Sequence, residues 1–132
     1  MKALLGEILE YKESFWIGGN SGAEMQTDLN FRTWFGHWMK KRFESKHMMY
    51  DLADYGCFLK GYPPTKISQN KAKYYQICYL PKNLSSPMVI VIFGDKVGQI
   101  LWSKQSFAFV IESNEIKASF LKYFNYFWKS NK

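Results

Sequence analysis

Two histidines and two cysteines are the side chains of this 132-residue chain best suited to act as nucleophiles or metal ligands. Cys57 and Cys78 lack the close spacing of a metal site, so we expect reduced, partly buried thiols rather than a disulfide. No carboxylate pair and no serine, histidine and aspartate order stands out. The sequence therefore predicts no metal site and no cofactor.

A glycine-rich stretch offers the best candidate for ligand binding. It follows a short apolar strand at residues 15–17, and its composition suits a tight turn or a close approach of the backbone to a ligand. No Lys-Ser or Lys-Thr pair follows, so it is not a phosphate-binding P-loop. Ligands in open α/β sheets gather beyond the carboxyl ends of strands. The candidate ligand-binding residues are Gly19, Asn20, Ser21 and Gly22.

Hydrophobic periodicity predicts the elements that must position this loop. Helices are expected over residues 2–12, from a cap at Thr27 or Asp28 to Phe43, and from a cap at Ser113 onward. Strands are expected at residues 15–17, 48–53, 74–80, 88–93, 98–103 and 107–111. The last three strands are joined by turns too short for helices, which predicts an antiparallel meander. This order fits an α/β or α+β domain with one sheet packed by helices.

The helices carry aromatic stripes that predict core faces rather than cofactor sites. In the second helix the stripe is Phe31, Trp34, Phe35, Trp38, Met39 and Phe43, with His37 between core positions and expected to be exposed. In the last helix it ends at Trp128, which we expect to be buried against the sheet. The hairpin around Gly94, Asp95 and Lys96 could build the core or form a binding loop, and we favour the structural role.

Composition and charge limit the class of protein and its possible partners. Hydrophobic residues make up 47% of the chain, enough for one domain over residues 1–132, and the net charge is +7. Residues 1–31 hold two lysines against five acidic residues, whereas residues 40–73 hold eight basic residues against three acidic ones. The basic middle is either a solvated face or a surface for an anionic partner. The first residues form neither a signal peptide nor a membrane span, so we expect a cytoplasmic protein with no membrane partner.

An ordered set of short motifs runs through the second half of the chain. It comprises Leu80-Pro81, Gly94-Asp95-Lys96-Val97, Trp102, Val110-Ile111-Glu112, and Phe124 with Trp128-Lys129. With Phe15-Trp16-Ile17-Gly18-Gly19 upstream, the chain resembles the effector domain of archaeal TrmB-like transcription regulators. The resemblance covers nearly the whole chain and is specific from Tyr79 onward.

This resemblance implies an α/β domain of phospholipase D-like fold, with a mixed sheet, an antiparallel C-terminal meander and helices packed on its faces. It also implies a dimerising module that senses a small-molecule effector beside a winged-helix DNA-binding domain. Residues 1–12 predict one helix only, so we expect no winged helix in this chain and contact with DNA only indirectly or through a separate winged-helix domain. We expect a homodimer.

Phospholipase D chemistry needs His-x-Lys followed by an aspartate. His37 and His47 are each followed two residues later by methionine, so we expect a non-catalytic domain. The alternative is a small basic nucleic-acid-binding protein, because Tyr74, Tyr75 and Tyr79 lie near lysines on a predicted strand and could stack on bases.

Overall fold

The computed structural model describes residues 2–18, 29–53, 74–81, 88–101 and 107–130. Its elements are α1 (Lys2–Ile8), β1 (Glu13–Ile17), α2 (Leu29–Glu44), β2 (Met48–Ala53), β3 (Tyr75–Tyr79), β4 (Met88–Phe93), β5 (Lys96–Leu101), β6 (Phe107–Glu112) and α4 (Asn114–Ser130). All six expected strands and all three expected helices are present, with differences at their ends. Residues 54–73 and 82–87, which connect these strands, lie outside the described residues.

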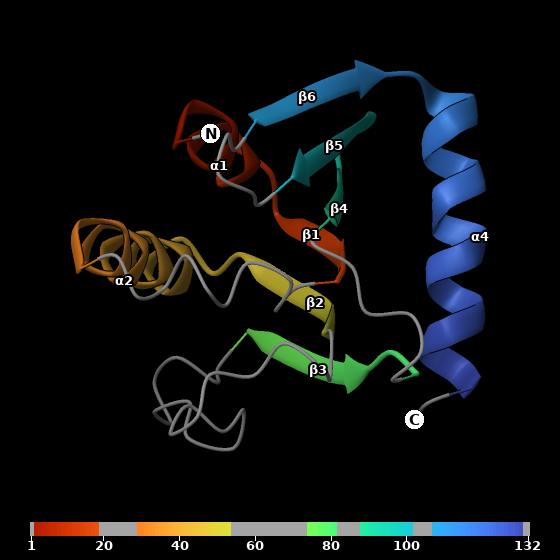
Figure 1. The fold of residues 1–132 in the computed structure, drawn as a ribbon, viewed down its shortest axis with the longest axis horizontal. Coiled ribbons are helices and arrows are strands. Elements are labelled where there is room, and N and C mark those ends of the chain that lie inside the picture. Colours follow the sequence, from red (N-terminus) through yellow and green to blue (C-terminus); the bar gives the residue numbers. More distant parts are fainter. Residues whose placement is uncertain (1, 19–28, 54–73, 82–87, 102–106, 131–132) are drawn as a thin grey trace.

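The six strands form one mixed sheet in the order β3-β2-β1-β4-β5-β6 (Figure 1). β1, β2 and β3 are parallel neighbours, whereas β4 pairs antiparallel with β1. β4, β5 and β6 form the antiparallel meander that the short turns predicted. The chain is therefore a mixed α/β domain with its antiparallel strands in the C-terminal half.

Alternating side chains divide the sheet between two cores, one on each face. On one face α1 and α2 pack on a core that includes Trp16, Val91 and Trp38, and on the other α4 packs on Ile92, Val97 and Phe124 (Figure 1). The stripe of α2 is confirmed at Trp38, which is buried, and at Trp34, Phe35 and Met39, which are partly buried.

Two expectations about the helices need correction. The first helix ends at Ile8 rather than at residue 12, because the chain turns at Leu9 and Glu10 to enter β1. Trp128 is half-buried rather than buried. It lies near the end of α4, where its ring packs edge-on against Tyr50 and stacks on Phe124, and Phe124 is the residue that fills the core. The Ser113 cap is confirmed, since its hydroxyl accepts a hydrogen bond from the Ile116 amide at 3.2 Å.

The β4–β5 hairpin is fixed to the N-terminal segment. Gly94 has a φ of 56° and lies directly against the Tyr11 ring, so an added Cβ would clash with that ring. Lys96 forms an ion pair with Glu7 of α1 and lies 5.9 Å from the centre of the Tyr11 ring. These contacts support the structural role that we favoured for this hairpin.

Candidate functional site

A buried polar cluster lies where the three parallel strands begin. Ser14 is in β1, His47 immediately precedes β2, and both are fully buried. The Ser14 hydroxyl lies 2.7 Å from His47 Nε2, and His47 Nδ1 lies 2.6 Å from the carbonyl oxygen of Tyr11. A serine hydroxyl, a histidine and an oxygen that orients the histidine are the parts of a nucleophile and its base.

The hydrogen bonds assign the proton positions in this pair. A carbonyl oxygen can only accept, so His47 Nδ1 carries the proton and donates it to Tyr11. His47 Nε2 is then an acceptor for the Ser14 hydroxyl, while Trp16 Nε1 donates to the same hydroxyl oxygen at 2.7 Å. Burial lowers the pKa of His47 below its ordinary value of 6.5, and the Arg42 cation adds to this effect, while the hydrogen bond to Tyr11 opposes it; the lowered pKa leaves the imidazole neutral at pH 7.

Arg42 ties the end of α2 to the same strand ends. Its Nη1 donates to the carbonyl oxygens of His47 at 3.1 Å and Tyr74 at 2.7 Å, and its guanidinium lies 5.7 Å from the centre of the Tyr75 ring. Arg42 is fully buried, and this desolvation lowers the pKa of its guanidinium. It therefore belongs neither to a solvated basic face nor to a surface for an anionic partner, the two alternatives for the basic residues 40–73.

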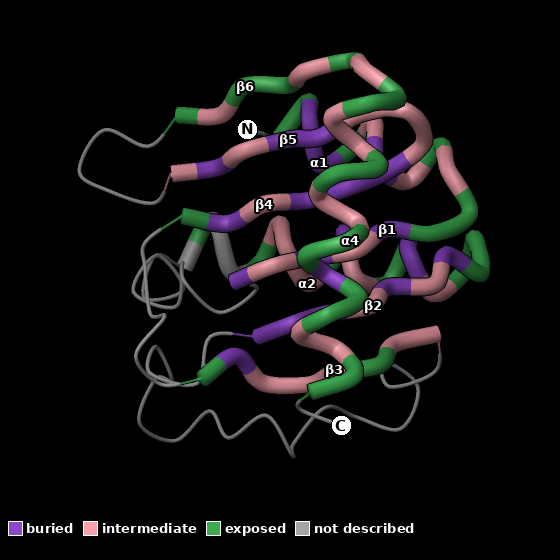
Figure 2. Tube along the Cα trace, turned by 90° about the vertical axis from the view of Figure 1, so that its right-hand side faces the viewer, coloured by how far each residue is buried: buried purple, intermediate pink, exposed green. Residues whose placement is uncertain are grey.

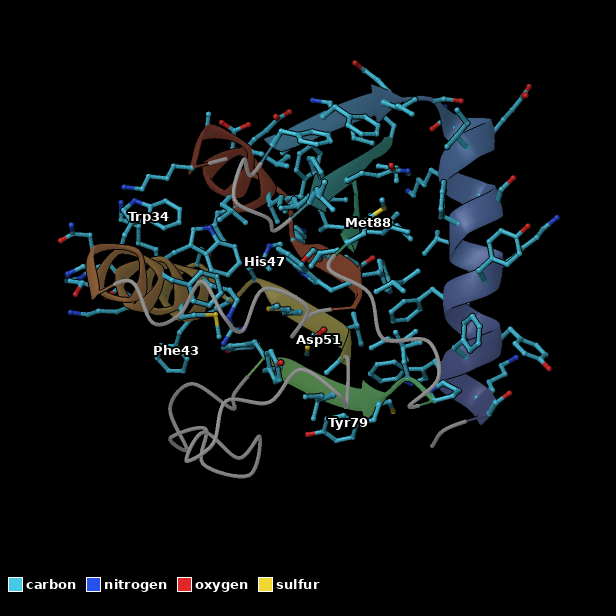
Figure 3. The ribbon with its side chains drawn as sticks, viewed as in Figure 1. Trp34, Phe43, His47, Asp51, Tyr79 and Met88 are labelled. Carbon is cyan, nitrogen blue, oxygen red and sulfur yellow. The ribbon has the colours of Figure 1, made fainter. Side chains whose placement is uncertain are left out.

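Asp51 adds a buried carboxyl group on β2. It accepts a hydrogen bond of 2.5 Å from the Tyr75 hydroxyl of the neighbouring strand, while its Oδ1 has no hydrogen-bond partner among the described residues. Burial raises the pKa of Asp51 to about 6, and the Tyr75 hydrogen bond opposes this shift. Figure 3 shows Asp51 and His47 in the interior; Asp51 lies in β2 and His47 immediately precedes it.

The position of the cluster limits its chemistry. A nucleophile must meet its substrate, yet Ser14 and His47 are both 0% exposed. The cluster joins β1, β2, β3 and α2 at the amino ends of the parallel strands, which is the end opposite to that where α/β sheets bind ligands. In the described structure it therefore holds these elements together.

The predicted ligand loop leaves the carboxyl end of β1. Gly18 is buried with a φ of 81°, and its amide donates to the Leu52 carbonyl at 2.7 Å. The candidate residues Gly19, Asn20, Ser21 and Gly22 lie outside the described residues, so they remain a prediction.

The proposed base-stacking tyrosines are engaged within the fold. The Tyr75 hydroxyl is bonded to Asp51 and its ring faces Arg42, whereas Tyr74 and Tyr79 are half-buried. Tyr75 is therefore no free platform for a base. Around the end of α2, Lys40, Lys41 and Lys46 are exposed. His37 is exposed as expected, Cys78 is half-buried, and Cys57 lies outside the described residues.

No protein-family model matches the sequence, and no curated protein does. The fold is similar to that of TrmBL2, an archaeal chromatin protein whose structure "shows a novel mode of DNA binding", with a TM-score of 0.60 and 15% identity. That match covers 99% of this chain and 48% of TrmBL2, so the chain spans about half the length of that protein. It is also similar to NucT from Helicobacter pylori, with a TM-score of 0.61, 12% identity, and coverage of 98% of this chain and 87% of NucT.

Proposed function

We propose that the chain is a non-catalytic, effector-sensing and dimerising domain of a TrmB-like transcription regulator, with a phospholipase D-like fold. The observation that carries the proposal is the fold shared with TrmBL2 over 99% of this chain. The motifs from Tyr79 to Lys129 resemble the pattern of the same family, which adds to this support. Such a domain acts in the cytoplasm and reaches DNA through a winged helix elsewhere. None of the described helices is both long enough and apolar enough to cross a membrane.

The absence of catalysis rests on the histidines. Neither His37 nor His47 has a lysine two residues later, and His47 is buried against Ser14. We expect no turnover of a generic phosphodiester, with or without divalent metal. Turnover that survives purification and disappears in a His37→Ala or His47→Asn variant would contradict the proposal, provided that each variant keeps its fold by circular dichroism.

Effector sensing is tested by thermal melting against a panel of sugars, nucleotides and organic acids. A ligand that binds only the folded state raises the melting temperature, and the increase grows with the logarithm of the ligand concentration once that concentration exceeds Kd. We expect a stabilising ligand whose effect is lost in an Asn20→Ala, Ser21→Ala double variant. A panel with no stabilising member, or an effect that the double variant leaves unchanged, counts against the proposed loop.

The second candidate is direct nucleic-acid binding. It is favoured by the exposed cations Lys40, Lys41 and Lys46 at the end of α2, and by the DNA binding described for TrmBL2. A measurement of DNA affinity at increasing salt concentration separates the two functions. Binding through phosphate contacts alone weakens steeply with salt, whereas binding that includes base contacts persists and would indicate direct recognition of nucleic acid.

A further inference from the structure

β6 forms an open edge of the sheet. It pairs with β5 on one side, and in both views no described element lies along its other side (Figures 1 and 2). Among the described residues, the backbone N–H and C=O groups on that side have no strand to pair with. Natural proteins protect such an edge with lysine, proline, a bulge or a covering element. The sequence of β6, FAFVIE, contains neither lysine nor proline, although the chain has a net charge of +7.

The side chains of this edge are unusually apolar for a solvated strand. Phe107 is 53% exposed, Phe109 44% and Val110 40%. The two phenylalanine rings stack with their centres 6.4 Å apart. Phe107 also continues an apolar row across the sheet, since it pairs with Leu101, which pairs with the exposed Met88. A contiguous apolar patch beside an unpaired edge marks a site of association.

We propose that β6 pairs antiparallel with β6 of a second copy of this chain, with Phe109 on the two-fold axis, to form one continuous sheet. This inference rests on the proposed function, because it names the dimer surface of that domain. A two-fold axis perpendicular to the sheet places the same face of each copy on the same side of the joined sheet. Odd-numbered residues of β6 must therefore pair with odd-numbered residues of the second copy, and even-numbered with even-numbered. This condition is met with Phe109 opposite Phe109 of the second copy.

The pairing around Phe109 is self-complementary. On the face covered by α4, Phe107 meets Ile111 of the second copy, and on the other face Ala108 meets Val110. Every such pair is apolar, and apolar cross-strand pairs stabilise antiparallel sheets. The charged Glu112 lies three residues from the axis, so the two Glu112 carboxylates end up about 20 Å apart and do not repel strongly. A different protein would need a strand with apolar residues at the matching positions, whereas a second copy of this chain has them by symmetry.

The experiment is oxidative cross-linking at single cysteines placed along β6, with the oligomeric state followed by light scattering. Phe109→Cys places two sulfurs opposite each other at the axis, within the reach of a disulfide. Phe107→Cys is the matched control, because Phe107 is at least as exposed as Phe109, whereas the two Phe107 positions of the dimer lie four residues apart, about 13 Å along the strand. We expect a covalent dimer from Phe109→Cys, and only the wild-type background from Phe107→Cys.

A charge variant tests the same contact without a cross-link. Phe109→Lys should weaken dimerisation at least tenfold, whereas Tyr123→Lys, on the exposed side of α4 with 61% exposure, should leave it unchanged. Circular dichroism of each variant checks the fold. A wild-type dimer that is indifferent to Phe109→Lys, or equal cross-linking at Phe107, overturns the β6 pairing and leaves the proposed function standing. A wild-type chain that stays monomeric at high concentration overturns both the β6 pairing and the dimerisation that forms part of the proposed function.

Discussion

At the scale of single residues, the structure assigns Gly94 a role that the sequence only suggested. Gly94→Ala puts a Cβ at a φ of 56° and into the Tyr11 ring, so we expect a loss of about 2–4 kcal/mol of unfolding free energy. The matched control is Gly36→Ala, in α2, where an added Cβ meets nothing within 4 Å. That change should stabilise the protein by roughly 0.5–1 kcal/mol, because alanine favours a helix. Chemical melts that show equal effects would contradict the packing of Tyr11 on the hairpin.

The stability of the protein depends on pH through two buried groups, His47 and Asp51, and the two dependences have opposite signs. Burial lowers the pKa of His47, so the unfolded chain binds its proton first and stability falls as pH drops below about 6.5. The pKa of Asp51 is raised to about 6, so the folded chain binds its proton first, and this contribution to stability is lost as pH rises from about 4 through 6.

Asp51→Asn removes the second dependence while keeping an acceptor for Tyr75. We expect the unfolding free energy of the variant, relative to the wild type, to rise by about 2–3 kcal/mol between pH 4 and pH 7. Melts at several pH values measure this difference. A difference that stays constant with pH would mean that Asp51 titrates alike in the folded and unfolded chains.

Residue roles were the hardest feature to predict from the sequence. Arg42 sits in a run of cations at the end of a helix, a place where solvated charges are usual, and only the convergence of the α2 end with the starts of β2 and β3 buries it. His47 follows that run, and its partner Ser14 is distant in sequence. The available signal was weak: a histidine immediately before a predicted strand.

At the scale of elements, hydrophobic periodicity was enough to predict every described helix and strand, because each packs one apolar face on the sheet. The sheet order was not predictable in this way. β1 pairs with β4 rather than with a sequence neighbour on that side, and nothing local in either strand selects this partner. The degree of burial along α4 also depended on tertiary placement, since Phe124 and Trp128 belong to the same stripe but differ in exposure.

This difference along α4 sets a test of the helix packing. Phe124→Ala should cost about 3–5 kcal/mol of unfolding free energy, because the ring is 2% exposed and contacts Phe15 and Trp128. Tyr126→Ala, on the same helix with 69% exposure, is the control and should change stability by less than about 0.5 kcal/mol. Comparable losses in denaturant melts would mean that α4 presents another face to the sheet.

At the scale of the whole molecule, the charge distribution bears on the choice between the proposed regulator domain and a nucleic-acid-binding protein. The exposed cations around the end of α2 give attraction to any phosphate backbone, whereas Tyr75, one of the three tyrosines considered for base stacking, is bonded to Asp51. An attraction of this kind carries no base readout, because sequence is read at base edges. The sequence alone predicted the uneven charge, but the fold was needed to show that Arg42 is withdrawn from it.

We therefore expect weak binding to duplex DNA that is equal for unrelated sequences and falls steeply with salt. Neutralising three of the exposed cations with Lys40→Gln, Lys41→Gln and Lys46→Gln should make the log–log salt slope less negative by up to about 3, since each phosphate contact contributes about −0.9. The control carries the same charge change on α4, as Lys117→Gln, Lys122→Gln and Lys129→Gln, and should keep the wild-type slope. Fluorescence anisotropy with two unrelated duplexes, at low and high salt, measures these slopes. Tight binding to one duplex that persists at high salt would refute the effector-domain assignment, because phosphate contacts alone cannot produce it, and would establish direct DNA recognition by this chain.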